Sequence, residues 1–259
     1  MRIATWNVNS LAARMPRVLE WLQIAHPDVL CLQETKLADA AFPRDALSEL
    51  GYEAATHGIS QWNGVAILSR IGLQDVRRGF DREPGFPDPE ARAVAATCGD
   101  VRIWSIYVPN GRTVGSDAFA YKLAWLEAFH AAIDSEPKQP PLAILGDFNI
   151  APTDEDVWDP AAFIGSTHVT PDERSAVSAL VQLGLVDVQP RAFKGLPFTY
   201  WDYRAGNFHK GLGMRIDLVL LSQSIASQVS DAYIDRDTRK GKLPSDHAAV
   251  VVDLELSKN

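Results

Sequence analysis

Residues 142–155 read LAILGDFNIAPTDE, and this stretch indicates how the chain is built. The apolar run LAIL predicts a buried strand, and Asp147 and Asn149 follow it directly after Gly146. The two polar residues could form an Asx-turn, but we predict that they form the floor of an active site instead. In an extended chain, side chains at i and i+2 face the same side, so the second interpretation aims both at one substrate group while Phe148 turns into the core. We also expect Gly146 to let the backbone come close to that site.

Short apolar runs of the same kind recur along the chain and predict further buried strands. The later runs follow one another without helical spacers, which argues against a purely parallel, doubly wound sheet. We therefore predict an α/β fold, a four-layer α/β sandwich with two mixed β-sheets packed face to face and helices outside. The predicted strands are RIATW (2–6), DVLCLQ (28–33), GVAILS (64–69), VRIWSIYV (101–108), PLAILG (141–146), RIDLVLLS (215–222) and AAVVVDLEL (248–256).

Helical periodicity appears in residues 10–25, 117–133 and 172–183. Ser10 is a candidate N-cap for the first of these helices. No Pro/Gly/Ser-rich linker divides the chain, so we expect residues 1–259 to form a single catalytic domain. The first helix is expected to bury Leu11, Val18, Leu19, Leu22 and Ile24.

The composition excludes several classes of protein. With 46% hydrophobic and 22% charged residues, the chain is neither disordered nor membrane-spanning. Its two cysteines, Cys31 and Cys98, lie in apolar stretches without CxxC spacing, so we expect no disulfide framework, no cysteine zinc site and a cytoplasmic location. The net charge of −8 argues against nonspecific coating of nucleic acid, but it permits a local basic face.

A polar or ionisable side chain stands near one end of each of six predicted strands. Alternation in RIDLVLL places Asp217 on a buried face, where a carboxylate needs a partner, and His247 is the candidate. Taken singly, these residues have structural explanations: Glu34 with Lys36 fits a solvated strand end, and His247 fits a packed core histidine. Their co-occurrence favours an active site at the strand ends. The six residues are Asn7, Glu34, Tyr107, Asp147, Asp217 and His247.

These residue types suit hydrolysis of a phosphodiester. Mg²⁺ binds through one or two carboxylates and keeps several waters. Glu34, helped by Asn7, Asn9 or Asp246, supplies such a site, and Asp147 supplies a base for a water. Asn149, Tyr107 and a protonated His247 are donors for charge developing on the phosphate. No sequence motif of P-loop NTPases, serine hydrolases or zincins is present.

At this point the chain resembles the endonuclease/exonuclease/phosphatase superfamily and, within it, the abasic-site DNA repair nucleases of the exonuclease III type. The resemblance covers nearly the whole chain in the family's order. It implies a Mg²⁺-dependent enzyme, with Mn²⁺ as a possible substitute, that cleaves duplex DNA 5′ to abasic sites and trims 3′ ends in base excision repair. The matching segments are TWNVNSLAAR, LCLQETK, NGVAILS, YVPNG, GDFNIAPTDEDVWDP, FTYWDYR, RIDLVLLS and PSDHAAV.

The resemblance also assigns roles to residues. It implies a catalytic set of Tyr107, Asp147, Asn149, Asp217 and His247. It implies a metal and active-site network of Asn7, Glu34, Asp147, Asn149, Asp246 and His247. Asn9 departs from the pattern, because some relatives have an aspartate there. Met214 and Ile216 fall near positions that form an apolar pocket for the abasic sugar in relatives.

Aromatic and basic residues together predict a DNA-binding face, because bases stack on aromatic rings and phosphates pair with cations. Residues 201–215 hold one such cluster, and residues 239–242 hold a second cationic cluster. The alternative for the first cluster is a solvated loop with two core aromatics. The expected partner is duplex DNA with abasic sites or damaged 3′ ends, bound by a monomer. The expected DNA-binding residues are Arg14, Lys36, Trp201, Arg204, Lys210, Met214, Lys240 and Lys242.

Two other functions stay open at this level. The same chemistry could act on a lipid, inositol or nucleotide phosphate, and the aromatic and basic cluster argues against this. A catalytically silent DNA-binding module is the second alternative, but such a protein would not need the complete set of polar residues at the strand ends.

Overall fold

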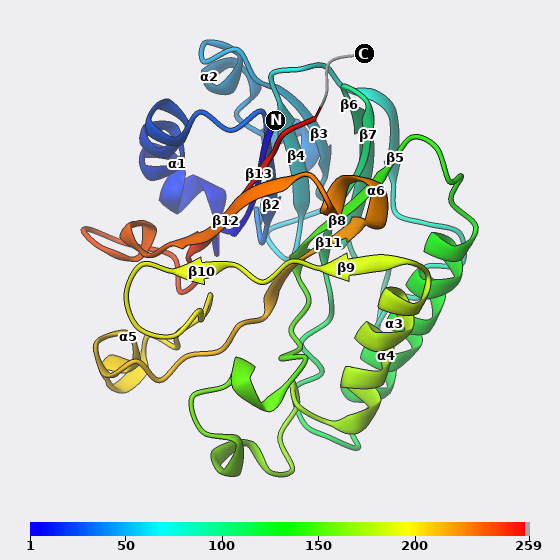
Figure 1. The fold of residues 1–259 in the computed structure, drawn as a ribbon, viewed down its shortest axis with the longest axis vertical. Coiled ribbons are helices and arrows are strands. Elements are labelled where there is room, and N and C mark those ends of the chain that lie inside the picture. Colours follow the sequence, from blue (N-terminus) through cyan, green and yellow to red (C-terminus); the bar gives the residue numbers. More distant parts are fainter. Residues whose placement is uncertain (257–259) are drawn as a thin grey trace.

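Two mixed β-sheets pack face to face in the computed structural model, which describes residues 1–256, and helices cover the two outer faces (Figure 1). The predicted four-layer sandwich is confirmed. One sheet has seven strands in the order β10-β12-β13-β1-β2-β4-β3. Its strands are β1 (Arg2–Asn7), β2 (Val29–Gln33), β3 (Glu53–His57), β4 (Val65–Ser69), β10 (Arg191–Ala192), β12 (Val229–Asp235) and β13 (Ala249–Leu254).

The other sheet has six strands in the order β5-β6-β7-β8-β11-β9. Its strands are β5 (Gln74–Arg78), β6 (Ala93–Cys98), β7 (Val101–Tyr107), β8 (Leu142–Asp147), β9 (Leu185–Asp187) and β11 (Asp217–Ser222). The helices are α1 (Leu11–Ala25), α2 (Arg44–Ser48), α3 (Asp117–Asp134), α4 (Pro171–Gln182), α5 (Asn207–Lys210) and α6 (Gln223–Ala226). Short 3₁₀ turns cover Asp39–Ala41, Asp154–Asp156, Pro160–Phe163, Arg204–Gly206 and Arg236–Arg239.

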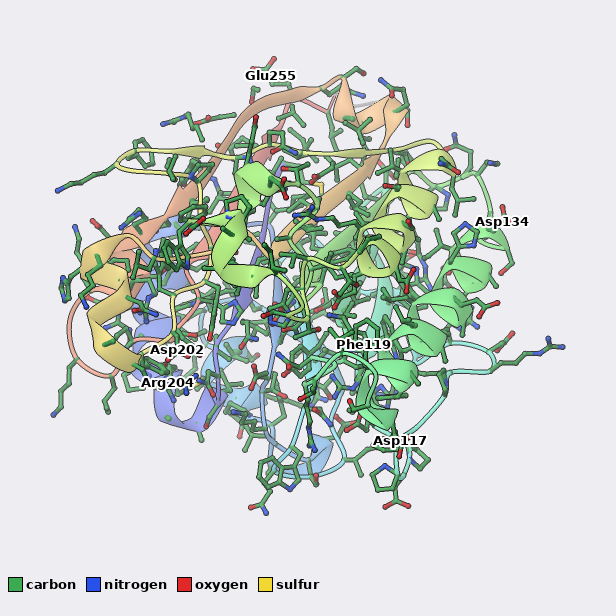
Figure 2. The ribbon with its side chains drawn as sticks, turned by 90° about the horizontal axis from the view of Figure 1, so that it is seen from below. Asp117, Phe119, Asp134, Asp202, Arg204 and Glu255 are labelled. Carbon is green, nitrogen blue, oxygen red and sulfur yellow. The ribbon has the colours of Figure 1, made fainter. Side chains whose placement is uncertain are left out.

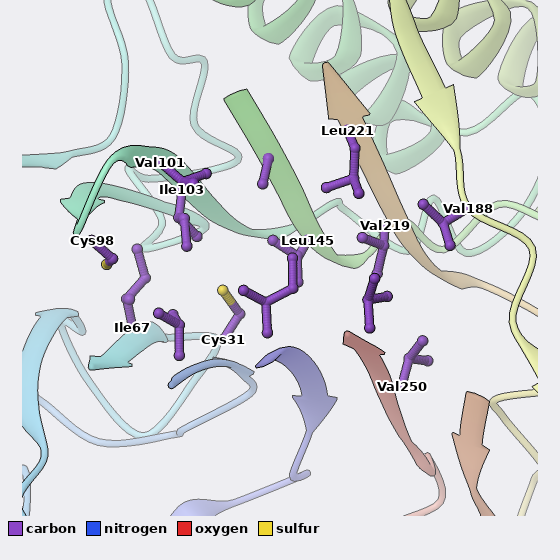
Figure 3. Packing of buried hydrophobic residues seen from close by; sticks show 14 of the residues in the cluster. Cys31, Ile67, Cys98, Val101, Ile103, Leu145, Val188, Val219, Leu221 and Val250 are labelled. Carbon is purple, nitrogen blue, oxygen red and sulfur yellow. The ribbon is translucent and has the colours of Figure 1, made fainter. Parts of the chain in front are cut away.

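The central strands are apolar on both faces because each sheet is covered on both faces. Alternate residues of β2 show this: Cys31 faces the core between the sheets, whereas Leu30 and Leu32 face α1. Figure 3 shows the core between the sheets, with Cys31 and Ile67 from one sheet opposite Ile103 and Leu145 from the other. This arrangement explains the near-continuous apolar runs in the sequence.

Both cysteines lie unpaired in this central core. Within residues 1–256, every helix is too short or too polar to span a lipid bilayer. All seven predicted strands and all three predicted helices form, within one or two residues of the expected bounds.

Three local predictions are wrong. Ser10 has φ of 89° and its side chain makes no capping hydrogen bond to α1. Ile24 is 74% exposed, because Trp21 and Ala25 take the buried side of that helix. Gly146 serves the pairing of β8 with β7 rather than approach to the site, since a Cβ at this position would clash with the carbonyl oxygen of Ile106.

Candidate active site

The strand directions bring the polar strand ends to one place. Parallel β7 and β8 set Tyr107 beside Asp147, and antiparallel β11 sets Asp217 on the other side of Asp147. In the seven-stranded sheet, β1 and β2 are parallel, so Asn7 ends next to Gln33, the residue before Glu34. Antiparallel β13 begins at the same end, just after His247. The predicted convergence of strand ends is confirmed, and it brings residues of both sheets together at one end of the sandwich.

Asn7 connects the two sheets at this end of the sandwich. Its Nδ2 donates to Oε1 of Glu34 at 2.8 Å and to Oδ2 of Asp147 at 2.9 Å. Lys36 Nζ lies 2.9 Å from Oε2 of Glu34. Burial opposes ionisation of Glu34, but the Lys36 ammonium and the Asn7 amide outweigh it and lower the pKa of this carboxyl group. Glu34 is therefore a carboxylate that is held in place and ready to bind a cation.

Asp217 and His247 form the expected pair. The Nδ1 atom of His247 lies 2.8 Å from Oδ2 of Asp217, and Nε2 lies 3.8 Å from Oδ2 of Asp147. Burial disfavours the imidazolium, but the carboxylates of Asp217 and Asp147 outweigh it and raise the pKa of His247 to about 10. A charged His247 can therefore serve as a donor toward a phosphate oxygen.

The backbone at Asp147 and Asn149 differs from the predicted extended chain. Asn149 has φ of 51°, and its backbone N–H donates to Oδ1 of Asp147 at 2.9 Å. This is an Asx-turn, so the turn interpretation is right for the backbone and the extended-chain geometry is wrong. The Asn149 carboxamide accepts from Asn110 Nδ2 at 3.1 Å and donates to the carbonyl of Val108. Phe148 is fully buried, as predicted.

Burial also shifts the pKa of Asp147. It raises the pKa of this carboxyl group, and the nearby Asp217 carboxylate adds to the effect, whereas His247 and Asn7 oppose it. A carboxylate whose pKa is raised in this way is a stronger base than an exposed aspartate.

The site can accept a divalent cation. Carboxylate oxygens of Glu34 and Asp147 and a ring nitrogen of His247 lie within 4.8 Å of one another. The two carboxylates can bind a cation, whereas the charged His247 has no free lone pair and is not a ligand, contrary to the expected metal network. Asp246 lies at the rim, where its Oδ1 accepts from Asn9 Nδ2 at 3.0 Å. Oxygen ligands from carboxylates and amides fit Mg²⁺ or Mn²⁺. Asn9 thus orients the Asp246 carboxylate and contributes no carboxylate of its own.

Two tyrosines border the site. Burial and the Glu34 carboxylate raise the pKa of Tyr107 well above its ordinary value, so its hydroxyl stays protonated and can donate. Tyr200 was not predicted from the sequence; its ring lies 4.9 Å from the His247 ring and its backbone pairs with both His247 and Met214. Tyr200 lies in the FTYW segment, but no local sequence pattern predicts that its ring pairs with His247, which is far away in the sequence.

A buried ion pair supports the loops behind the site. Lys122 and Glu173 are both fully buried and salt-bridged. Lys122 Nζ donates to the carbonyl of Asn149 at 2.7 Å, and Glu173 accepts from the backbone N–H of His168 at 2.9 Å. Burial and the Lys122 ammonium lower the pKa of His168 to about 3, so this histidine is neutral. The loops that contain Asn149 and His168 are thereby fixed to one charged pair.

The structure divides the predicted DNA-binding residues into two groups. Trp201 is fully buried, so its predicted contact with DNA is wrong: its ring packs against Phe208 in the core. Met214 is 6% exposed in a small apolar cluster with Ala151, Val157 and Ile216. Any contact of Met214 with DNA is therefore limited to the small exposed part of its side chain. Two further basic residues of these clusters are buried and structural, namely Arg215, paired with Asp156 and Asp187, and Arg239, stacked on aromatic rings.

The remaining basic residues are accessible or half-buried at the edge of the site. Lys210 and Lys242 are exposed, and Lys240 is exposed but paired with Asp237. Figure 2 views this end of the molecule and shows Arg204 beside Asp202, with which it forms an ion pair. Lys36 forms an ion pair with Glu34, and the Arg14 guanidinium donates to the hydroxyl of Tyr203 at 2.9 Å. Their contacts with DNA stay predictions.

The sequence matches the model of the endonuclease/exonuclease/phosphatase family over residues 4–247. The chain belongs to this family. A curated relative, exodeoxyribonuclease III of Haemophilus influenzae, is 32% identical, and the match covers 96% of this chain and 98% of the relative.

Solved structures of family members resemble the whole chain. A 3′ phosphatase from Neisseria, solved with a product DNA hairpin, is 39% identical with a TM-score of 0.94 over 99% of this chain and 100% of that one. An AP endonuclease from Archaeoglobus fulgidus is 33% identical with a TM-score of 0.93, at the same coverage of both chains.

Proposed function

We propose that the protein is a metal-dependent DNA repair nuclease that removes groups from 3′ ends and cleaves duplex DNA 5′ to abasic sites. The observation that carries the proposal is the buried cluster of polar residues at one end of the sandwich. In this cluster, Asn7 bridges Glu34 and Asp147 while Asp217 orients His247. The DNA substrates named for the relatives support it.

The residues divide the reaction between them. Asp147 accepts a proton from the attacking water, and Asn7 keeps its carboxylate oriented. His247 and Tyr107 donate to the phosphate oxygens as negative charge develops, and Asp217 fixes the imidazole ring. A bound Mg²⁺, with Mn²⁺ as substitute, would be held by Glu34 with Asp147 and Asp246 nearby and would supply Lewis acid assistance to the phosphate.

We further propose that 3′-end processing is the stronger activity. The Neisseria 3′ phosphatase is 39% identical to this chain, whereas the Archaeoglobus AP endonuclease is 33% identical. We also propose that residues 1–259 form one catalytic domain that acts as a monomer in the cytoplasm. The two free, buried cysteines fit a reducing compartment.

One set of substrates tests the function. Three duplexes, which carry an internal abasic analogue, a 3′-phosphate or a recessed 3′ end, are incubated with Mg²⁺, with Mn²⁺ or with EDTA. We expect turnover of all three with metal and none with EDTA, fastest on the 3′-phosphate. No metal-dependent product from any duplex would overturn the proposal, and faster abasic incision would overturn only the ranking.

A further inference from the structure

A cavity of about 370 Å³ opens next to the candidate active site, on the side of the six-stranded sheet. Three loops and the start of helix α3 line it, and Tyr107 belongs both to this cavity and to the active site. Asn110 lines it as well and holds Asn149 through its side chain. A substrate phosphate placed at Tyr107 therefore has its neighbouring nucleotide at the mouth of this cavity.

The rim of the cavity is aromatic and accessible. Trp62 is 67% exposed and Phe86 is 38% exposed, and both line the cavity, so they form an accessible aromatic patch. Phe86 stacks on Tyr121 with ring centroids 5.8 Å apart and an interplanar angle of 27°. Phe86 and Tyr121 thus form one stacked aromatic wall, whereas the Trp62 ring stacks on no other ring within residues 1–256.

The floor of the cavity is a network whose hydrogen bonds are already used. Glu90 forms an ion pair with Arg92 and accepts from the hydroxyl of Tyr121 at 2.9 Å. Asn63 Nδ2 also donates to Glu90 at 2.9 Å. These contacts make the floor rigid and neutralise its one carboxylate, so the negative charge of Glu90 does not repel a polyanion.

A cation stands on the opposite rim. Arg112 is exposed, and none of the carboxylates in the described part of the chain lies within ion-pair distance of its guanidinium group. Its backbone N–H donates to Oδ1 of Asn110 at 3.1 Å, which fixes the loop that carries it. Flat aromatic surfaces with a free arginine are the combination that binds single-stranded nucleic acid through base stacking and phosphate contact.

We propose that this cavity, which we name the Trp62 pocket and define by Trp62, Phe86, Tyr107, Arg112 and Tyr121, is a binding site for an unpaired nucleobase of the DNA strand whose phosphate is being hydrolysed. The proposal rests on the proposed function. A base inside a duplex has both faces covered by its neighbours, so only a frayed, mismatched or flipped nucleotide offers a free face to Trp62. The pocket therefore favours DNA whose terminal or flanking base is not paired.

The test compares two recessed 3′-end duplexes that differ only in whether the terminal base is paired or mismatched. Trp62→Ala is expected to lower kcat/KM on the mismatched end about tenfold and to change the paired end less than about twofold, as loss of one stacked base implies. Trp62→Phe should retain most of the preference. Phe193→Ala, which removes an exposed aromatic ring directly after edge strand β10, is the matched control and should change neither rate.

Binding provides a second readout that needs no turnover. The mismatched base is replaced by the fluorescent analogue 2-aminopurine, and its emission is measured with EDTA present. We expect quenching on binding to the wild type and Phe193→Ala, and restored emission with Trp62→Ala. Equal rate losses on both duplexes, no rate loss at all, or unchanged quenching in Trp62→Ala would each overturn the pocket while the nuclease function stands. Absence of wild-type cleavage would overturn the function, and quenching would still decide whether the pocket binds a base.

Discussion

The Nδ1 atom of His247 lies 2.8 Å from the Oδ2 atom of Asp217, and both side chains are buried beside Asp147. The second oxygen of Asp217 has no hydrogen-bond partner among the described residues. A buried carboxylate with one free oxygen and one imidazole partner is costly for stability, which points to a role in the reaction.

Asp217→Asn should lower kcat about a hundredfold, because a neutral amide no longer stabilises the imidazolium or fixes its orientation. His247→Ala should lower kcat more. The two residues act as a unit, so the double variant should be no slower than His247→Ala alone. Single-turnover rates on the 3′-phosphate duplex measure this cycle; additive losses would show that the two side chains act independently.

Asp147→Asn should lower the cleavage rate about a thousandfold while the Kd for duplex DNA changes less than about threefold, since the lost carboxylate acts as a base in the transition state. The matched control is Asp154→Asn, in the following loop, whose side chain is 69% exposed. Rates and DNA binding are measured on the same preparations. A loss of binding equal to the loss of rate would contradict the assigned role.

Glu34→Gln should raise the Mg²⁺ concentration needed for half-maximal rate at least about tenfold, because it removes the carboxylate charge that would hold the cation. Glu20→Gln, on the exposed face of α1, should leave the metal requirement unchanged. Initial rates across a Mg²⁺ titration report the shift. An unchanged midpoint with a lower maximal rate would place Glu34 outside the metal site.

The sequence predicts the central strands and the polar constellation because both follow from local pattern: apolar runs, and one polar residue at each strand end. Strand β6, AVAATC, escaped prediction since small alanines carry little strand preference and gain it only between β5 and β7. The sequence places Trp201 on the DNA-binding surface, because the same mixture of aromatic and basic residues occurs whether the rings bind bases or fill a core. The Trp62 pocket is assembled from loops far apart in the chain, so only the fold brings its residues together.

Lys122→Met should destabilise the protein by about 3–5 kcal/mol, because it leaves Glu173 buried without its cation. Lys122→Met combined with Glu173→Leu should recover part of this loss, since the double change removes the unpaired charge as well. The free energy of unfolding in urea measures both variants. A double variant less stable than Lys122→Met alone would show that the remaining hydrogen bonds of Glu173, rather than its charge, hold these loops.

Glu83→Gln should remove a pH dependence of stability. Burial raises the pKa of Glu83 to about 7, and a hydrogen bond from Trp125 offsets only part of this increase. Since the folded state holds the proton more tightly than the unfolded chain, the wild type should lose stability as pH rises from the unfolded pKa of about 4.5 through about 7. The loss is at most about 3.5 kcal/mol, because one pKa unit corresponds to about 1.4 kcal/mol.

The neutral glutamine keeps an oxygen to accept the hydrogen bond that Trp125 Nε1 donates to Glu83 at 3.0 Å. The variant should therefore match the wild type near about pH 5 and be more stable by about 2–3 kcal/mol near about pH 8, as measured by urea unfolding at each pH. Glu49→Gln, an exposed position after α2, should follow the wild type at both pH values. A constant difference between Glu83→Gln and the wild type across this range would mean that Glu83 ionises in the folded protein as it does in the unfolded chain.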